Sequence, residues 1–211
     1  MAISVEDLVE VIETHKAARR PKVTFEEYLE WPGESGYLEW IDGEVIEMTP
    51  PSIKHQLTVG FLHTILKIYV KHHDLGFVVP SPVAMKLAKQ RRGREPDILF
   101  LAKGRQGLLK KNYVDGAADM AVEIISPESI GRDRGDKFVE YEAAGVREYW
   151  LIDPDRRQAE FYVLQTDGRY HLAQIQDGVF HSEVIDGLWL RVEWLWKLPN
   201  ELDVLRELGV I

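Results

Sequence analysis

The chain has 211 residues, of which 45% are hydrophobic, so it can bury one sizeable core and is not largely disordered. It has no cysteine, which excludes disulfides and cysteine-ligated zinc. Its formal net charge of −9 argues against a protein that coats nucleic acid without regard to sequence. No stretch resembles a signal peptide or has the length of a membrane span, so we expect a cytoplasmic protein without a membrane partner.

The N-terminal segment is predicted to be helical. Residues 4–19 have a narrow apolar stripe, and we expect them to form a helical arm within residues 1–22. A short second helix is predicted from Thr24 to Trp31. Thr24 is its expected N-cap, and Glu27 stands at the capping-box position.

A hairpin and a long helix are predicted next. The pair Asp42-Gly43 is typical of a two-residue turn and predicts strands at 37–41 and 44–48. Ser52 is the expected N-cap of a helix that runs to about His72. The apolar side of this helix is predicted to consist of Leu57, Phe61, Ile65 and Ile68.

Strands dominate the rest of the chain. Residues 118–125 are almost wholly apolar and are the predicted central strand. A helix is predicted at 133–144, closed by Gly145, and a closing helix within residues 198–211. The other predicted strands are 76–79, 82–87, 97–101, 148–152 and 159–163, followed by short strands to about residue 192. Strands interleaved with helices imply an α/β sandwich.

Aromatic residues mark two features of the C-terminal half. In the strand at 148–152, Trp150 and Ile152 are expected to share one buried face while Leu151 takes the other. The run from Trp189 to Trp196 is unusually aromatic and is a candidate dimer patch, so we expect a homodimer.

Two predicted strands each carry a carboxylate. Asp97 begins the apolar run of the first, and Glu123 lies inside the apolar run of the second. A buried charge is costly unless it is paired or bound to metal, and oxygen-only ligands suit Mg²⁺ or Mn²⁺. With Lys137 on the following helix, these are the groups needed to hydrolyse a phosphodiester. The alternatives are that Asp97 is a turn or cap residue and that Glu123 lies on a solvated face.

Charge is unevenly distributed along the chain. Residues 86–111 contain nine basic and two acidic residues, a net of +7, which leaves −16 on the rest. Such a basic block around Asp97 favours binding of a polyanion to one face, although a solvated loop is the alternative. The expected nucleic-acid contacts are Lys86, Lys89, Arg91, Arg92, Arg94, Arg132 and Arg134.

Several segments, taken in order, resemble a large bacterial family of restriction endonucleases in the PD-(D/E)XK nuclease superfamily. They are Glu39-Trp40-Ile41-Asp42-Gly43-Glu44, Pro50-Pro51-Ser52 with His55, Pro96-Asp97, Val122 to Pro127, Arg132 to Lys137 with Tyr141, and Gly145 to Pro154. The resemblance covers roughly residues 24–192. It implies an α/β fold with a restriction-endonuclease-like mixed sheet flanked by helices. We expect an N-terminal helical arm (1–22), a nuclease-like domain with a β-rich C-terminal part (23–197) and a tail (198–211).

The sequence departs from the superfamily pattern at one position. The pattern has a lysine two residues after the glutamate, where this chain has Ile125. An apolar side chain there cannot stabilise charge on a reacting phosphate. The resemblance implies that the lysine has moved to the next helix, as Lys137. The alternative is that Lys137 is a helix-surface lysine paired with Asp133 or Glu140.

The resemblance also implies the rest of the site. Asp97, Glu123 and the carbonyl of Ile124 would hold Mg²⁺ or Mn²⁺. Supporting roles are expected for His55, Glu39, Glu44 and Tyr141, the glutamates as outer or third metal ligands and Tyr141 as a group that orients Lys137.

We therefore expect a metal-dependent endonuclease whose substrate is nucleic acid, in the first place DNA. The alternative is a catalytically degenerate module with the same fold that binds nucleic acid or dimerises. A third reading is a nuclease-like fold that binds other proteins.

Overall fold

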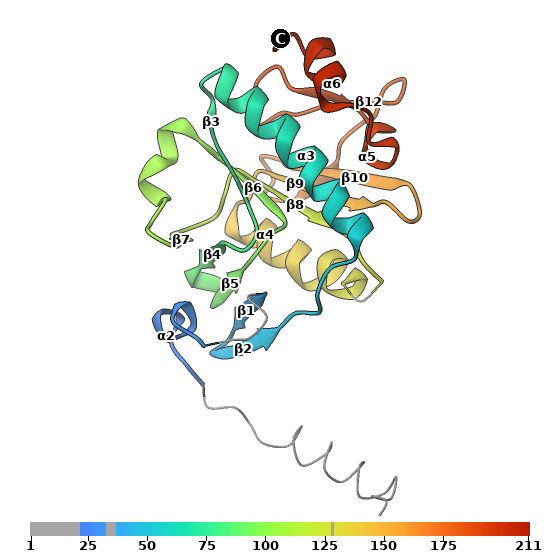
Figure 1. The fold of residues 1–211 in the computed structure, drawn as a ribbon. Coiled ribbons are helices and arrows are strands. Elements are labelled where there is room, and N and C mark those ends of the chain that lie inside the picture. Colours follow the sequence, from blue (N-terminus) through green and yellow to red (C-terminus); the bar gives the residue numbers. More distant parts are fainter. Residues whose placement is uncertain (1–21, 33–36, 128) are drawn as a thin grey trace, which may run out of the picture.

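The computed structural model describes residues 22–32, 37–127 and 129–211 (Figure 1). The predicted helical arm at 4–19 lies outside these residues. No helix in the described part of the chain combines the length and apolar character needed to cross a membrane.

Eight helical segments are described. Thr24 caps the first and Ser52 the second, as predicted, and Glu27 completes the capping box with Thr24. Gly145, with a φ of 84°, closes the helix before it, also as predicted. The α-helices are α2 (Phe25–Leu29), α3 (Ile53–His72), α4 (Phe138–Ala144), α5 (Trp194–Lys197) and α6 (Glu201–Glu207). The other helical segments are η1 (Ala88–Gln90), η2 (Lys103–Leu108) and η3 (Arg132–Lys137).

Most of the strands form two mixed sheets. The larger sheet has six strands in the order β11-β10-β9-β8-β6-β3, and the smaller has five in the order β2-β1-β5-β4-β7. The strands of the larger sheet are β3 (Gly76–Pro80), β6 (Ile98–Ala102), β8 (Met120–Ile124), β9 (Glu148–Asp153), β10 (Gln158–Leu164) and β11 (Tyr170–Leu172). Those of the smaller sheet are β1 (Leu38–Ile41), β2 (Glu44–Glu47), β4 (Ala84–Leu87), β5 (Arg92–Arg94) and β7 (Tyr113–Val114). The chain also forms a separate pair, β12 (Val179–His181) with β13 (Trp189–Arg191).

The larger sheet separates two apolar cores. Helix α3 and the C-terminal elements pack on one face, and α4 with part of the smaller sheet packs on the other (Figure 1). We call the cluster under α3 the first core; it includes Phe61, Leu62, Ile65, Leu66, Val122, Trp150 and Ile152. We call the cluster under α4 the second core; it includes Met85, Leu99, Ala121, Ile125, Tyr141, Tyr149 and Leu151. These layers form the predicted α/β sandwich.

Two predictions about buried strands are confirmed. Strand β8 lies inside the sheet, antiparallel to β6 and parallel to β9, and all five of its residues are buried. On β9, Trp150 and Ile152 pack in the first core while Leu151 packs in the second. The alternation follows from the two-residue period of an extended strand that is covered on both faces.

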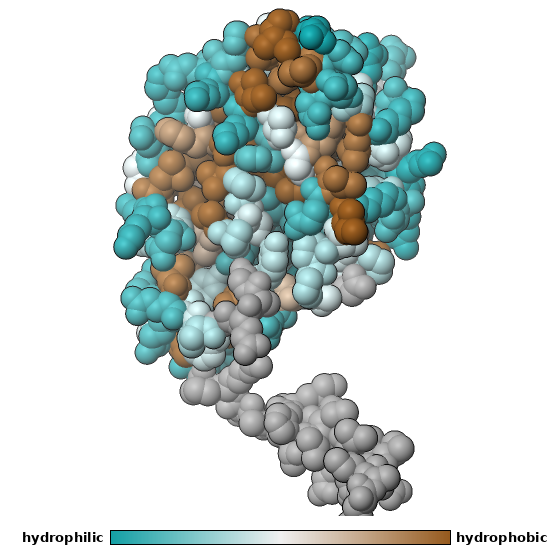
Figure 2. Space-filling model, in the orientation of Figure 1, coloured by the Kyte–Doolittle hydropathy of each residue, from teal (hydrophilic) through white to brown (hydrophobic). Residues whose placement is uncertain are grey.

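The apolar side of α3 differs from the prediction. Phe61 and Ile65 are buried, but Leu57 is 58% exposed and Ile68 also reaches the surface. Apolar side chains accordingly interrupt the polar surface on the face that α3 occupies (Figure 2). The buried side is instead shifted toward Leu62 and its neighbours, because apolar residues surround most of this helix and leave its orientation to tertiary packing.

The C-terminal aromatic run is part of the fold. Trp194 is buried in the first core, and Trp189 and Trp196 pack against that core. Helix α6, within the predicted closing segment, also packs there through Val204 and Leu205. The run from Trp189 to Trp196 is therefore partly built into the first core, and both the dimer patch and the homodimer stay predictions.

Candidate active site

The register of the larger sheet brings the two predicted carboxylates together. Ile98 of β6 pairs with Val122 of β8, so the same register places Asp97 opposite Glu123. The Ile124 amide donates to Asp97 Oδ2 at 2.7 Å, which fixes this carboxylate against the end of β8. Both acids thus lie close together where β6 begins and β8 ends, although they are 26 residues apart in sequence.

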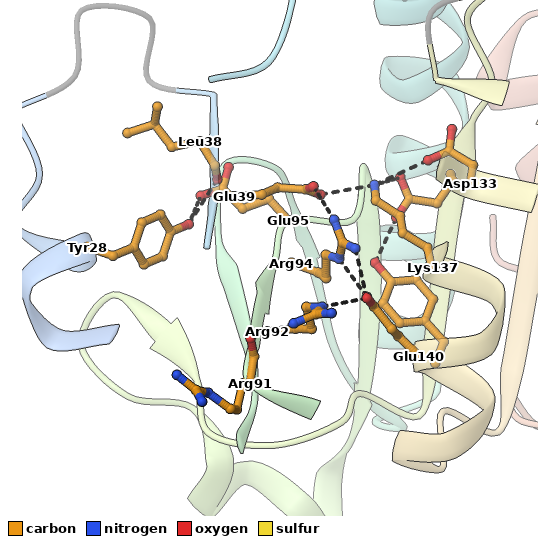
Figure 3. A network of polar contacts seen from close by, with 12 residues as sticks. Tyr28, Leu38, Glu39, Arg91, Arg92, Arg94, Glu95, Asp133, Lys137 and Glu140 are labelled. Carbon is orange, nitrogen blue, oxygen red and sulfur yellow. Dashed lines mark hydrogen bonds and ion pairs between the residues drawn. The ribbon is translucent and has the colours of Figure 1, made fainter. Parts of the chain in front are cut away.

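Lys137 reaches the same point from the following helix. Its Nζ atom lies 2.8 Å from Glu123 Oε2, 3.2 Å from Glu39 Oε1 and 3.4 Å from Asp133 Oδ1. The residue is only 4% exposed, so Lys137 is not a helix-surface lysine, although it does pair with Asp133. Figure 3 shows the ammonium facing Glu39 and Asp133.

Tyr141 orients the glutamate rather than the lysine. Its hydroxyl donates to Glu123 Oε1 at 2.8 Å, one turn of helix after Lys137. Glu123 therefore has both carboxylate oxygens occupied, one by a phenol and one by an ammonium.

Burial sets the protonation tendencies of these groups. Removal from water raises the pKa of Glu123 to about 8, with Lys137 opposing the rise and the charges of Asp133 and Asp97 adding to it. Burial by itself would lower the pKa of Lys137, but three neighbouring carboxylates raise it well above its usual range. The site therefore holds a positively charged Lys137 beside Glu123, whose ionisation is opposed by burial and by the charges of Asp133 and Asp97.

A cavity of about 400 Å³ opens over these groups. Asp97, Glu123 and Lys137 all line it, as does His55 from the first turn of α3. His55 Nε2 lies 3.1 Å from Asp97 Oδ2, so the histidine is a direct neighbour of the first carboxylate. Arg132 and Asp133 of η3 line the same cavity.

A family model described as "Uma2: Putative restriction endonuclease" matches residues 25–193. The chain belongs to this family. It is also similar to the crystal structure of a "putative nuclease belonging to DUF820" from Anabaena variabilis, with a TM-score of 0.68 and 20% identity over 83% of this chain and 98% of that one. This likeness confirms the predicted nuclease-like α/β fold. A comparison with curated proteins finds no match.

Glu39 connects the Uma2-family site to an ion-pair network. Arg94 Nη1 donates to Glu39 Oε2 at 2.6 Å, and Arg94 Nε donates to Glu140 Oε2 at 2.7 Å. Arg92 joins Glu140 to Asp42 at the hairpin turn. Figure 3 shows Arg94 between the two glutamates, and Arg94 is only 1% exposed. The network ties the smaller sheet to α4 and holds Glu39 in place.

The basic residues do not form one free face. Arg94 is buried in the network and Arg92 is largely engaged there, so neither is presented to a DNA backbone as predicted. Lys86 pairs with Glu26, and Arg134 pairs with Glu160. The remaining predicted contacts are Lys89 and Arg91, which are exposed, and Arg132, which lines the cavity.

Two acids that line the cavity of the Uma2-family site were not predicted as site residues from the sequence, and one predicted acid lies outside the cavity. Asp133 and Glu95 both line the cavity, whereas Glu44 is exposed on β2 and does not line it. Asp133 stands four residues before Lys137, a spacing that puts both on one side of a helix and was the available signal. Glu95 directly precedes the Pro96-Asp97 pair, and this position beside a predicted site acid was the available signal.

Glu95 has an environment that favours its protonated form. The Tyr28 hydroxyl lies 2.8 Å from Glu95 Oε1 and 2.9 Å from the Leu38 carbonyl oxygen. One hydroxyl has one proton, so both contacts are hydrogen bonds only when Glu95 donates to Tyr28 and Tyr28 donates to Leu38. Burial raises the pKa of Glu95 to about 7, from an ordinary value of 4.5.

Glu95→Gln should stabilise the metal-free protein more at pH 8 than at pH 5. Because the folded-state pKa is raised, the folded protein binds more protons than the unfolded chain between pH 4.5 and 7, so the contribution of Glu95 to stability is lost as pH rises through that window. Glutamine keeps the donor without the charge. Urea unfolding in the presence of a chelator measures the difference, with the exposed Glu30→Gln as control. A pH-independent difference would contradict the assignment.

Proposed function

We propose that this Uma2-family protein is a metal-dependent phosphodiesterase that cuts DNA, an endonuclease using Mg²⁺ or Mn²⁺. The observation that carries the proposal is that Asp97, Glu123 and Lys137 line one cavity, with the Lys137 ammonium 2.8 Å from Glu123. Two carboxylates and a fixed cation are the protein groups that metal-assisted hydrolysis of a phosphodiester needs. Membership of a restriction-endonuclease family supports the same reaction.

The donor set fits a hard divalent cation. No group of three or more acidic or histidine side chains, among the residues described, is arranged as a ready-made metal cage. Mg²⁺ does not require one, because it is usually held by one or two carboxylates together with water and substrate phosphate. The raised pKa of Glu123, caused by burial and increased by Asp133 and Asp97, supports the fit because a bound cation would stabilise this carboxylate.

The carbonyl of Ile124 is a further oxygen donor in this proposal. The N–H and C=O of one residue in an extended strand point to the same side, and the Ile124 N–H points toward Asp97. Extended two residues beyond the Ile98–Val122 pair, the β6–β8 register would bring Pro96 opposite Ile124. Proline has no N–H, so the sheet offers no backbone donor to that carbonyl from Pro96.

The chain's own groups would divide the work as follows. Asp97, Glu123 and the Ile124 carbonyl hold the cation, which when bound lowers the pKa of a coordinated water and offsets phosphate charge. His55 restrains Asp97, and Tyr141 restrains Glu123. The Lys137 ammonium stabilises the negative charge that develops on the phosphate in the transition state.

Asp97→Asn and Glu123→Gln should each weaken Mn²⁺ binding by at least about tenfold, because each removes a charged ligand. Both should also lose cleavage of supercoiled plasmid. Titration calorimetry of the metal-free protein measures the affinity, and Glu44→Gln, outside the cavity, is the matched control. Unchanged Mn²⁺ affinity in both site variants would reject the metal site.

A catalytically degenerate module that binds nucleic acid is the second candidate. Ile125, at the superfamily's usual lysine position, is buried in the second core, and Lys137 is shared among three carboxylates. Binding of DNA by the wild type without cleavage of any nucleic acid in Mn²⁺ would favour this candidate.

A further inference from the structure

We propose that Asp133 and Glu39 are positioning residues that hold the Lys137 ammonium in its working orientation. The inference rests on the proposed function in one respect, namely that Lys137 acts on the substrate. It adds a role for Asp133 and replaces the predicted role of Glu39 as a metal ligand.

The three carboxylates around Lys137 are not equivalent. Glu123 makes the shortest contact, 2.8 Å, and is also one of the two acids that face each other across β6 and β8. Asp133 and Glu39 contact the ammonium at 3.4 and 3.2 Å from other sides of it, and neither lies on these strands. If Glu123 is used as a metal ligand, Asp133 and Glu39 are the carboxylates that remain for Lys137.

Glu39 is itself held by a second cation. Its Oε2 accepts from Arg94 at 2.6 Å, which leaves Oε1 for Lys137. Arg94 is in turn fixed by two hydrogen bonds to Glu140. The carboxylate of Glu39 therefore cannot rotate away from Lys137 without breaking a buried ion pair.

Asp133 is held through its main chain. It lies in η3, a π-helical segment, whose hydrogen bonds span five residues in place of four. The Tyr149 hydroxyl donates to the Asp133 carbonyl oxygen at 2.9 Å and so anchors the residue to β9. Asp133 is buried, its Oδ1 accepts no hydrogen bond from the described residues, and that atom forms an ion pair with the Lys137 ammonium at 3.4 Å.

The first experiment detects the ammonium directly. An ordered, buried ammonium exchanges its protons slowly, so protein labelled with ¹⁵N at lysine should give a sharp Lys137 Nζ signal, assigned by its absence from Lys137→Met. Asp133→Asn keeps the shape of the side chain and removes its charge, and it should shift and broaden that signal. Asp136→Asn, an exposed position on the same segment, should not.

The second experiment uses plasmid cleavage in Mn²⁺. Asp133→Asn should lower kcat by between about tenfold and a hundredfold, the cost of misplacing a catalytic group, while KM and Mn²⁺ affinity stay unchanged. When Asp133→Asn is added to Lys137→Met, it should cause no further loss of kcat, because Asp133 acts through Lys137. If Asp133→Asn does not fold, the same measurements are made on Asp133→Ser.

The outcomes separate this proposal from the proposed function. An unchanged Lys137 signal in Asp133→Asn overturns the positioning role whether or not the wild type cuts DNA. A loss of Mn²⁺ affinity overturns it as well, because Asp133 would then be a ligand. A broadened signal in a protein that cuts no nucleic acid supports the positioning of Lys137 and rejects only the nuclease activity.

Discussion

Lys137→Met is expected to reduce metal-dependent DNA cleavage by at least about a hundredfold, corresponding to about 3 kcal/mol of lost transition-state stabilisation. Methionine keeps much of the apolar stem and removes the charge that faces the cavity. The measurement is single-turnover cleavage of plasmid by equal amounts of folded protein. Lys71→Met, at an exposed position near the end of α3, is the control. Equal rates in wild type and Lys137→Met would remove Lys137 from the mechanism.

The same substitution should also destabilise the protein, which a surface lysine would not do. Loss of the ammonium leaves Glu123, Glu39 and Asp133 buried with less counter-charge, and breaking a buried ion pair typically costs about 3–5 kcal/mol. Burial already raises the pKa of Glu123, and removal of the ammonium, which opposes that rise, should raise the pKa further. The folded variant can then neutralise this carboxylate by binding a proton at low pH, so the cost there is smaller. The loss in free energy of unfolding should therefore grow as pH rises from 5 to 9.

Arg94→Met should lower the free energy of unfolding by about 3–5 kcal/mol, because it removes the guanidinium that pairs with the buried Glu39 and the partly buried Glu140. Chemical denaturation at pH 8 measures the change. The exposed Arg91→Met, three residues away, should stay within about 0.5 kcal/mol of wild type.

A second set of variants tests why Arg94 matters. If the cost comes from uncompensated charge, adding Glu39→Gln and Glu140→Gln to Arg94→Met should recover much of the lost stability. Recovery would identify the network as electrostatic. No recovery would show that the packing of the arginine stem carries the effect.

Pairing of the two carboxylates could be predicted from the sequence because strong local signals surround them. Asp97 and Glu123 each adjoin or lie within an apolar run that a turn or a proline terminates, which defines both strands and their ends. Lys137 could be named from its helix, but its place as the migrated lysine beside Glu123 rested on the family resemblance, since its distance from Glu123 depends on a loop. The third and fourth carboxylates, Glu39 and Asp133, come from a hairpin and a helix, and no local pattern shows that these two elements pack against each other.

The basic block shows what sequence reasoning missed. Strand β5 has three residues, two of them arginine, and no alternation of apolar and polar side chains marks it as a strand. The carboxylates that bury Arg94 lie 55 and 46 residues away in the sequence. Nothing near Arg94 therefore distinguishes a buried network from a solvated patch. The π-helical form of η3 was missed for a related reason, since no local pattern in its six residues distinguishes a π-helix from an α-helix.

The helical origin of Lys137 has a consequence for how nucleases of this type are recognised. A lysine on the same strand as its glutamate is held at a fixed sequence separation by the pleat. Here Glu123 and Lys137 are 14 residues apart. After Ile125, whose amide still donates to the Ile152 carbonyl of β9, the described residues of the connection lie outside the strands of the larger sheet. Insertions or deletions in this connection would change the spacing of the motif without moving either charge. A search for relatives should accordingly match the three-dimensional arrangement of the acids and the ammonium, and treat the number of residues between them as free to vary.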